Sequence, residues 1–262
     1  MTNWWLFPPL TKEVQLDEKW SFVHNKEEHC GPANPPERCG DNWDHTAVDA
    51  EHRLVLSLVP GKRTAANCAQ VVADVKKRTG GRADMLFTSD EHAPYTGALA
   101  TAYGQAVPVP QRPGPGRPPQ PRQVMPPELC YATVRKTRQK GRVVEVVRTL
   151  VFGTVALLDL WLTRSTVSRT INTSFVERNN GTDRGQNARK VRKTYCFSKD
   201  WELHNAASYF IAFSYNFCWP VRTLDILRGD GTRLKCTPAM AAGLSDHLWS
   251  TEEWVTYPAR GP

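Results

Sequence analysis

The alternation of apolar and polar positions between residues 14 and 23 predicts a β-strand. Its apolar face carries Val14, Leu16, Trp20 and Phe22. Its polar face carries Gln15, Asp17, Lys19 and Ser21. Because successive side chains of a strand point to opposite faces, the carboxyl group of Asp17 is expected to lie away from the apolar face.

The pattern that follows predicts a mixed sheet built through a crossover helix. Thr64 is a candidate N-cap, and the residues behind it have the apolar spacing of one helix face: Cys68, Val71, Val72 and Val75. After that helix, a short strand ends at Asp90, and a second helix begins close behind it. The predicted order is strand 14–23, polar loop 24–44, hairpin 45–59, helix 64–79, strand 83–90 and helix 91–104. This order is typical of an α/β fold in which three antiparallel strands are extended by a parallel one.

The second half of the chain predicts a proline-rich excursion, a basic hairpin and further helices. The excursion, residues 106–128, is rich in proline and arginine and is predicted to be a spacer or a DNA contact through Arg112, Arg117 and Arg122. A hairpin is expected at 129–153, a helix at 154–163 and a long helix N-capped by Ser198. We therefore expect a leader (1–11), one large domain (12–220) and a tail with a short helix near Thr237 (221–262).

The charge and the cysteine content of the chain indicate its expected binding partner and cellular compartment. It has 34 Lys and Arg against 26 Asp and Glu, for a net charge of +8, as expected of a protein that acts on phosphates. The seven cysteines have no regular spacing, which favours reduced thiols in the cytoplasm. No signal peptide or long apolar run is visible. A zinc site in the first loop is an alternative with poor ligand spacing; its candidates are His29, Cys30, Cys39 and His45.

Three acidic residues stand at positions where chemistry is expected. Asp17 lies in the middle of a strand, Asp90 ends a parallel strand, and Glu177 heads a strongly basic segment that runs to Asp200. Phosphoryl transfer with two metal ions needs carboxylates that converge from different elements, because the ions lie roughly 3.5–4 Å apart. The structural alternative treats each acid singly, as a turn, cap or charge-balancing residue. His92, two residues after Asp90, has the same two interpretations: a proton-transfer or DNA contact, or a polar residue at a helix start.

The short motifs around these acids resemble those of one family of enzymes. LDEKWSFV around Asp17, TSDEHAPY around Asp90 and FVERNNGTDR around Glu177, followed by RKTYCFSKDWELH, are similar to the catalytic blocks of bacterial insertion-sequence transposases of the DDE class. The IS-one family is the nearest in pattern. The resemblance implies a ribonuclease H-like fold with a mixed five-stranded sheet flanked by helices. It also implies that Asp17, Asp90 and Glu177 bind two Mg²⁺ or Mn²⁺ ions.

The same resemblance implies the reaction and its partners. The expected reaction is metal-dependent endonuclease cleavage at the transposon ends, followed by attack of the freed 3′-hydroxyl on target DNA. The partners would be double-stranded DNA, further copies of the chain, and an upstream reading frame that supplies end recognition. The location would be the prokaryotic cytoplasm, at the nucleoid. The alternatives are an inactive DNA-binding remnant of a truncated transposase and a ribonuclease H-like nuclease that cuts without joining.

Basic residues behind Glu177 are the candidates for DNA contact. The family carries a basic residue seven positions after the Glu, here Arg184, and two helical turns would place both on one face. Gly181 and Gly185 each cost about 1 kcal/mol inside a helix, so a break between Glu177 and Arg184 is an alternative. Asn179 stands where relatives commonly have His. The other predicted phosphate contacts are Arg189, Lys190, Arg192 and Lys193.

Overall fold

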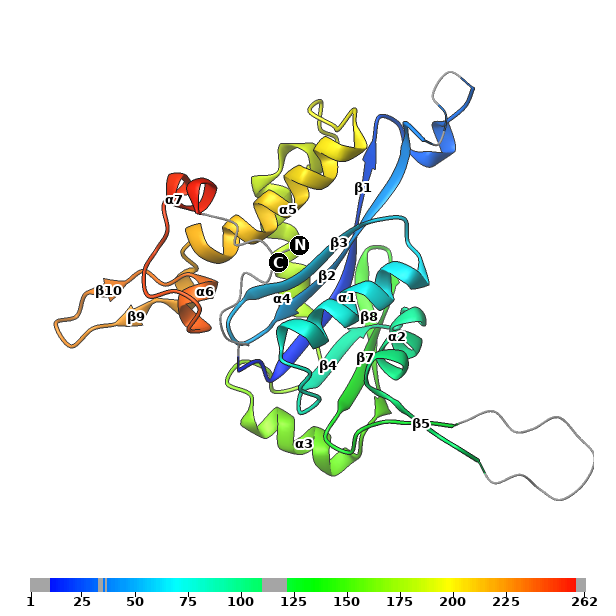
Figure 1. Cartoon of the computed structure of the whole chain (residues 1–262), viewed down its shortest axis with the longest axis vertical. Helices are drawn as coiled ribbons and strands as arrows, with labels where there is room; N and C mark the ends of the chain where they lie inside the picture. Colours follow the sequence, from blue (N-terminus) through cyan, green and yellow to red (C-terminus); the bar gives the residue numbers. More distant parts are fainter. Residues whose placement is uncertain (1–9, 33–34, 36, 110–121, 258–262) are drawn as a thin grey trace, which may run out of the picture.

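A computed structural model describes residues 10–32, 35, 37–109 and 122–257 of the chain, and a mixed six-stranded sheet forms its centre (Figure 1). The strand order in this sheet is β3-β2-β1-β4-β7-β8. The strands are β1 (Glu13–Val23), β2 (Gly40–Asp49), β3 (Leu54–Gly61), β4 (Leu86–Asp90), β7 (Cys130–Gln139) and β8 (Arg142–Phe152). Two small antiparallel pairs lie outside it: β5 (Gln105–Val107) with β6 (Arg122–Val124), and β9 (Ile226–Leu227) with β10 (Arg233–Leu234).

The helices follow the expected order along the chain. They are α1 (Ala65–Arg78), α2 (Pro94–Tyr103), α3 (Val155–Arg164), α4 (Ser174–Gln186), α5 (Trp201–Cys218), α6 (Pro238–Ala241) and α7 (Thr251–Thr256). Short 3-10 turns are η1 (Glu27–His29), η2 (Ala188–Lys190) and η3 (Arg222–Leu224). Among the described helices, none combines the length and the apolar character needed to cross a membrane.

The sheet is mixed because β2 and β8 run antiparallel to the other four strands. β1 pairs antiparallel with β2 and parallel with β4, and β4 pairs parallel with β7. In the β1–β4 pairing Leu16 lies opposite Ser89, so Asp17 and Asp90 follow as the next residues on adjacent parallel strands. The crossover from β3 to β4 is made by α1, as the sequence predicts.

One face of the sheet packs against α1 and α2, which lie together across it in Figure 1. The apolar stripe predicted for α1 is buried there: Cys68, Val71, Val72 and Val75 are all fully buried. They pack with sheet residues of the same face, among them Val14, Leu16, Leu54, Leu56 and Phe87. The apolar face of β1 therefore forms the floor of the main core.

The opposite face packs against α3, α4 and α5, each over a different part of the sheet. Leu158 and Trp161 of α3 cover Ala132 and Val134 of β7. Ala212 and Tyr215 of α5 cover Val55 and Leu58 of β3. Between them α4 lies over the polar face of β1, so that face is enclosed as well. The polar face of β1 is thus an interior surface lined with hydrogen-bonding groups.

Most predicted elements are confirmed, and three details are wrong. The central sheet has six strands rather than five, because β8 of the basic hairpin pairs along β7. The N-cap of α5 is Asp200, not Ser198: the Asp200 carboxylate accepts the Leu203 N–H at 2.8 Å. Helix α4 is unbroken through Gly181 and Gly185. Of the proline-rich excursion, residues 110–121 with Arg112 and Arg117 lie outside the described residues, whereas Arg122 begins the exposed strand β6.

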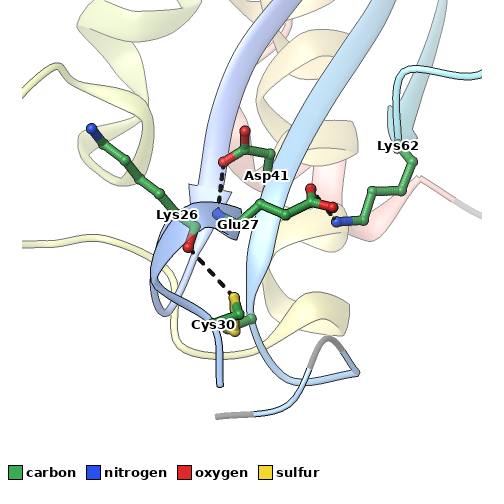
Figure 2. The surroundings of a disulfide bond; sticks show 6 residues. Lys26, Glu27, Cys30, Asp41 and Lys62 are labelled. Atoms are coloured by element: carbon green, nitrogen blue, oxygen red, sulfur yellow. Dashed lines mark hydrogen bonds and ion pairs between the residues drawn. A yellow bond between two sulfur atoms is a disulfide. The ribbon is translucent and has the colours of Figure 1, made fainter. Parts of the chain in front are cut away.

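The expectation that all cysteines are reduced is wrong for two of them. Cys30 and Cys39 form a disulfide across the loop between β1 and β2 (Figure 2). Turn η1 lies in this loop and is held by two contacts of Glu27. Its N–H donates to Asp41 Oδ1 (3.2 Å), and its carboxylate forms an ion pair with Lys62 (2.9 Å). Irregular spacing and an odd count do not exclude one bridge inside a single loop. The bond also removes both sulfurs from the loop zinc site considered above. The other five cysteines are free thiols.

Candidate carboxylate site

Asp17 and Asp90 meet on the face of the sheet that α4 covers. Asp17 lies in the middle of β1, where its Oδ1 accepts the N–H of Glu18 (2.9 Å). Asp90 is the last residue of β4, and its Oδ1 accepts the N–H of His92 (3.2 Å). Parallel pairing of the two strands puts successive residues side by side on one face. The structure therefore brings together the first two acids that the sequence singled out.

Helix α4 is fixed to β1 by a glutamine that sequence reasoning missed. Gln15 Oε1 accepts the backbone N–H groups of Phe175 (2.8 Å) and Val176 (3.2 Å), which the helix leaves without internal partners. Gln15 Nε2 donates to Asn172 Oδ1 (3.1 Å) just before the helix. Since Gln15 precedes Asp17 by two residues on the same strand face, this contact sets the register of α4 over Asp17. Glu177, in the first turn, is positioned by it.

A second contact joins α4 to Asp17 one turn further along the helix. Asn180 is buried, and its Nδ2 donates to Asp17 Oδ2 at 2.7 Å. The amide oxygen Oδ1 of Asn180 is buried without a hydrogen-bond partner. An unpaired buried acceptor beside two carboxylates is costly unless something binds it. Asn180 was not among the predicted residues, although its place three residues after Glu177 puts both on neighbouring positions of one helix face.

Electrostatics link Asp17 to each of the other two acids. Burial, the negative charge of Asp90 and that of Glu18 raise the pKa of Asp17 to about 7, and Glu177 contributes in the same direction. The pKa of Asp90 is raised as well, by burial and by the charge of Glu18. Like charges that share a site disfavour ionisation. Burial and the neighbouring acids therefore make the ionised form of Asp17 unfavourable.

Glu177 is held by a direct hydrogen bond from a lysine. Its Oε1 accepts hydrogen bonds from Lys136 Nζ and from Thr173 Oγ1 (2.7 Å). Burial raises its pKa, but these hydrogen bonds and the charges of Lys136 and Arg138 leave the pKa below the usual value. Glu177 is the most exposed of the three, with 46% of its side chain accessible. Lys136 extends from β7 on the face of Val134, the strand partner of Asp90, so the basic hairpin reaches the site.

The predicted basic residues divide into two groups. Arg184 lies near Asp17, and Arg192 lies near Arg184; burial and the Arg192 charge lower the pKa of Arg184. Thus the seven-residue spacing does place Glu177 and Arg184 on the face of α4 that meets Asp17. Arg192 and Lys193 are exposed and Arg189 is half-buried. These four remain candidates for contact with a polyanion.

The prediction that Lys190 contacts DNA is wrong, because its ammonium group is buried in an ion pair. Its side chain is 1% exposed and forms an ion pair with the fully buried Asp44 of β2. Lys19 joins the same cluster through Asp44 (3.2 Å) and through Asp183 of α4. The pKa of Asp44 stays well below its usual range despite burial, because both ammonium groups face it. The cluster ties the segment behind α4 to the sheet, a role that a count of basic residues does not reveal.

No family model and no curated protein matches the chain.

The donor set fits a hard divalent cation. Asp17, Asp90 and Glu177 offer carboxylate oxygens, and the unpaired Oδ1 of Asn180 adds an amide oxygen. Mg²⁺ is bound through oxygen ligands, and usually through one or two carboxylates with substrate oxygens completing the shell. The raised pKa of Asp17 has the same physical basis, since a cation would offset the repulsion among the acids. The residues present therefore suit Mg²⁺ or Mn²⁺ better than a thiolate-binding metal.

Proposed function

We propose that the chain is the catalytic domain of a DDE transposase, which cleaves DNA and joins the cut strand to a target in the presence of Mg²⁺ or Mn²⁺. The observation that carries the proposal is that Asp17 on β1 is followed closely by Asp90 on the adjacent strand β4 and is within electrostatic reach of both Asp90 and Glu177 on α4. It is supported by the electrostatic coupling of Asp17 to both other acids. We further propose double-stranded DNA as substrate and a homo-oligomer as the active form.

The strand order supports a ribonuclease H-like identity for the fold. The first five strands of the sheet have the order β3-β2-β1-β4-β7, with β2 alone antiparallel, and α1 makes the crossover to β4. Acids in the middle of β1, at the end of β4 and on a later helix are what the resemblance implies. The sixth strand, β8, is an addition that carries the basic hairpin.

Basic side chains border the carboxylates on two sides. Lys136 and Arg138 approach from β7, and Arg184 and Arg192 approach from α4 and the segment behind it. A phosphodiester strand lying between these groups would bring a phosphate over the three acids. Phosphate contacts position a nucleic acid without reading its sequence. The arrangement therefore suits chemistry at the backbone, with end recognition supplied elsewhere.

The residues divide the work in the following way. Asp17, Asp90 and Glu177 would hold the metal ions, with the Asn180 amide beside them. Bound ions would activate the attacking oxygen and stabilise the leaving oxygen. Lys136 would hold Glu177 in place until a cation and substrate arrive. Gln15 sets the height of Glu177 above Asp17 through its two bonds to the start of α4.

The test is a DNA cleavage and strand-transfer assay on the purified chain. The substrate is a supercoiled plasmid that carries the DNA flanking the reading frame, incubated with Mg²⁺ or with EDTA. We expect nicked and joined products only with Mg²⁺. Asp17→Asn, Asp90→Asn and Glu177→Gln should each lower product formation by about 100-fold or more. Asp159→Asn, an exposed acid on α3, should leave it unchanged.

The same assay separates the alternatives. Cleaved but unjoined DNA would identify a nuclease. Products formed only when the upstream reading frame is fused to the chain would show that end recognition is encoded separately. DNA binding without products in either form would identify an inactive remnant. Equal activity of the wild type and the three carboxylate variants would refute the assigned site.

A further inference from the structure

A second cluster of ligand atoms lies on the other face of β1 from Asp17. It joins Glu18 of β1, Cys68 of α1 and His92 of the loop between β4 and α2. One carboxylate oxygen, the thiol sulfur and one imidazole nitrogen all lie within 4.8 Å of one another. Cys68 is fully buried, and Glu18 is only 8% exposed. Three elements far apart in sequence thus bring three different donor types to one interior point.

Several polar atoms of this cluster have no partner in the protein. Oε1 of Glu18 and Nε2 of His92 are both buried without a hydrogen bond of normal geometry, and the buried Tyr95 hydroxyl approaches the Glu18 carboxylate. The other Glu18 oxygen, Oε2, is held by two donors of Arg63, at 2.9 and 3.2 Å. A buried carboxylate oxygen that is left unpaired costs free energy, and the arginine fixes the carboxylate through its other oxygen. Such an arrangement is typical of a ligand held ready for a cation.

A fourth possible donor lies nearby on the same sheet face, outside the group of three whose ligand atoms lie within 4.8 Å of one another. His45 lies directly opposite Glu18 in the β1–β2 pairing and is fully buried. Its Nδ1 lies 3.2 Å from the carbonyl oxygen of Val59, and its Nε2 has no partner. A carbonyl can only accept, so Nδ1 carries the proton and Nε2 keeps a free lone pair. Zinc-bound histidines are oriented by such a bond from their other ring nitrogen.

We propose that Glu18, Cys68 and His92 form a Zn²⁺ site, with His45 as the fourth ligand. Zinc is bound by thiolate, imidazole and carboxylate groups in tetrahedral sites, and a closed set of four protein ligands indicates a structural ion. A site that contains a thiolate does not suit Mg²⁺, which prefers oxygen. The ion would join α1 and the loop behind Asp90 to the central strand. The proposal does not rest on the proposed transposase chemistry, because its three ligands are different residues from the three acids and Glu18 points to the other face of β1.

The test uses the full chain, stripped with a chelator and then titrated with Zn²⁺ or Co²⁺. The probes are the metal content per chain and the thiolate-to-cobalt charge-transfer absorption, neither of which depends on catalysis. A Cys196→Ser background removes the exposed free thiol. We expect one tightly bound equivalent of Zn²⁺ and a cobalt spectrum with a thiolate band. Cys68→Ser should abolish the band, and His92→Gln should weaken Zn²⁺ binding by at least ~100-fold.

Control variants separate loss of the proposed zinc ligands from loss of any buried thiol and from misfolding. Cys130→Ser removes another buried thiol and should keep both the band and the stoichiometry. Asp17→Asn should also keep them, which separates this site from the carboxylates on the other face. His92 is only partly buried, so His92→Gln is expected to fold even if Cys68→Ser does not. A cobalt spectrum without a thiolate band, or a band that survives Cys68→Ser, would overturn the proposal. So would His92→Gln binding Zn²⁺ as tightly as the wild type.

Discussion

Asp17→Asn should stabilise the metal-free protein at neutral and alkaline pH, although it should abolish activity. The native fold raises the pKa of Asp17 from 3.8 to about 7, mainly through burial and the nearby charges of Asp90 and Glu18. The folded state therefore binds a proton that the unfolded state releases between these two values. The stability that this proton provides is fully present below about pH 4 and is lost as the pH rises through about 7.

The magnitude follows from the size of that shift. About three pKa units at ~1.4 kcal/mol each correspond to about 4 kcal/mol, and Asp17 retains some solvent contact, so we expect about 2–4 kcal/mol. The amide that replaces the carboxylate carries no charge at any pH. Its new N–H₂ group would meet Asn180, and that side chain can turn its unpaired Oδ1 toward it. The hydrogen bond between strand and helix is therefore preserved.

The assay is urea unfolding in EDTA, followed by tryptophan fluorescence from pH 4 to pH 8. The free energy of unfolding of Asp17→Asn should equal that of the wild type near pH 4 and exceed it by about 2–4 kcal/mol at pH 8. Added Mg²⁺ should stabilise the wild type and leave the variant unchanged. Asp159→Asn serves as the control and should follow the wild type throughout. A variant that is less stable than the wild type at pH 8 would refute the claim that Asp17 is repelled by its neighbours.

Three further predictions concern residues outside the carboxylates. Lys190→Met should lower the free energy of unfolding by about 3–5 kcal/mol, because it leaves the buried Asp44 carboxylate with one cationic partner fewer. The exposed Arg192→Ala is the contrasting variant. It should leave the free energy of unfolding unchanged and weaken DNA binding in a filter assay. Cys30→Ser should lower it by about 2–3 kcal/mol in oxidising buffer, with no difference from the wild type under dithiothreitol. Burial and the Lys190 charge lower the pKa of His204 to about 4, so the contribution of His204 to the free energy of unfolding should fall by about 3 kcal/mol as the pH drops from ~6.5 to ~4. Asp17 titrates in the same range, so this contribution is measured as the difference between the wild type and His204→Gln at each pH.

The sequence predicted the fold where local patterns decide structure. Alternation in β1, the spaced valines of α1 and the cap at Thr64 each have a local cause, and each is confirmed. The N-cap of α5 was placed two residues early because Ser198 and Asp200 are both good caps. Ser198 instead contacts the buried ring of His204, with Oγ 2.8 Å from Nδ1. The choice between two adjacent cap residues depends on tertiary contacts that no local pattern contains.

The acidic residues of the candidate site could be predicted from the sequence, but the residues that hold them in place could not. Asp17, Asp90 and Glu177 stand out by position along predicted elements. Gln15 and Asn180 act through contacts between β1 and α4 that are about 160 residues apart in sequence. Lys190 was predicted to contact DNA phosphates because lysine in a basic tract is usually exposed. Its partner Asp44 lies 146 residues away, so nothing local distinguishes it from its neighbours.

The polar face of β1 explains how one strand can both hold the fold and position the site. Gln15 binds the first turn of α4, Asp17 binds Asn180 in its middle, and Lys19 binds Asp183 near its end. Residues two apart on a strand are spaced about 6.6–6.8 Å, and these contacts follow the helix in the same order along its axis. The outer two contacts fix the helix, so the middle one holds Asp17 against a rigid partner. A carboxylate held in this way cannot move away from Asp90 and Glu177 to relieve repulsion. Burial and this repulsion together raise its pKa, and a bound cation is the physical means of lowering it.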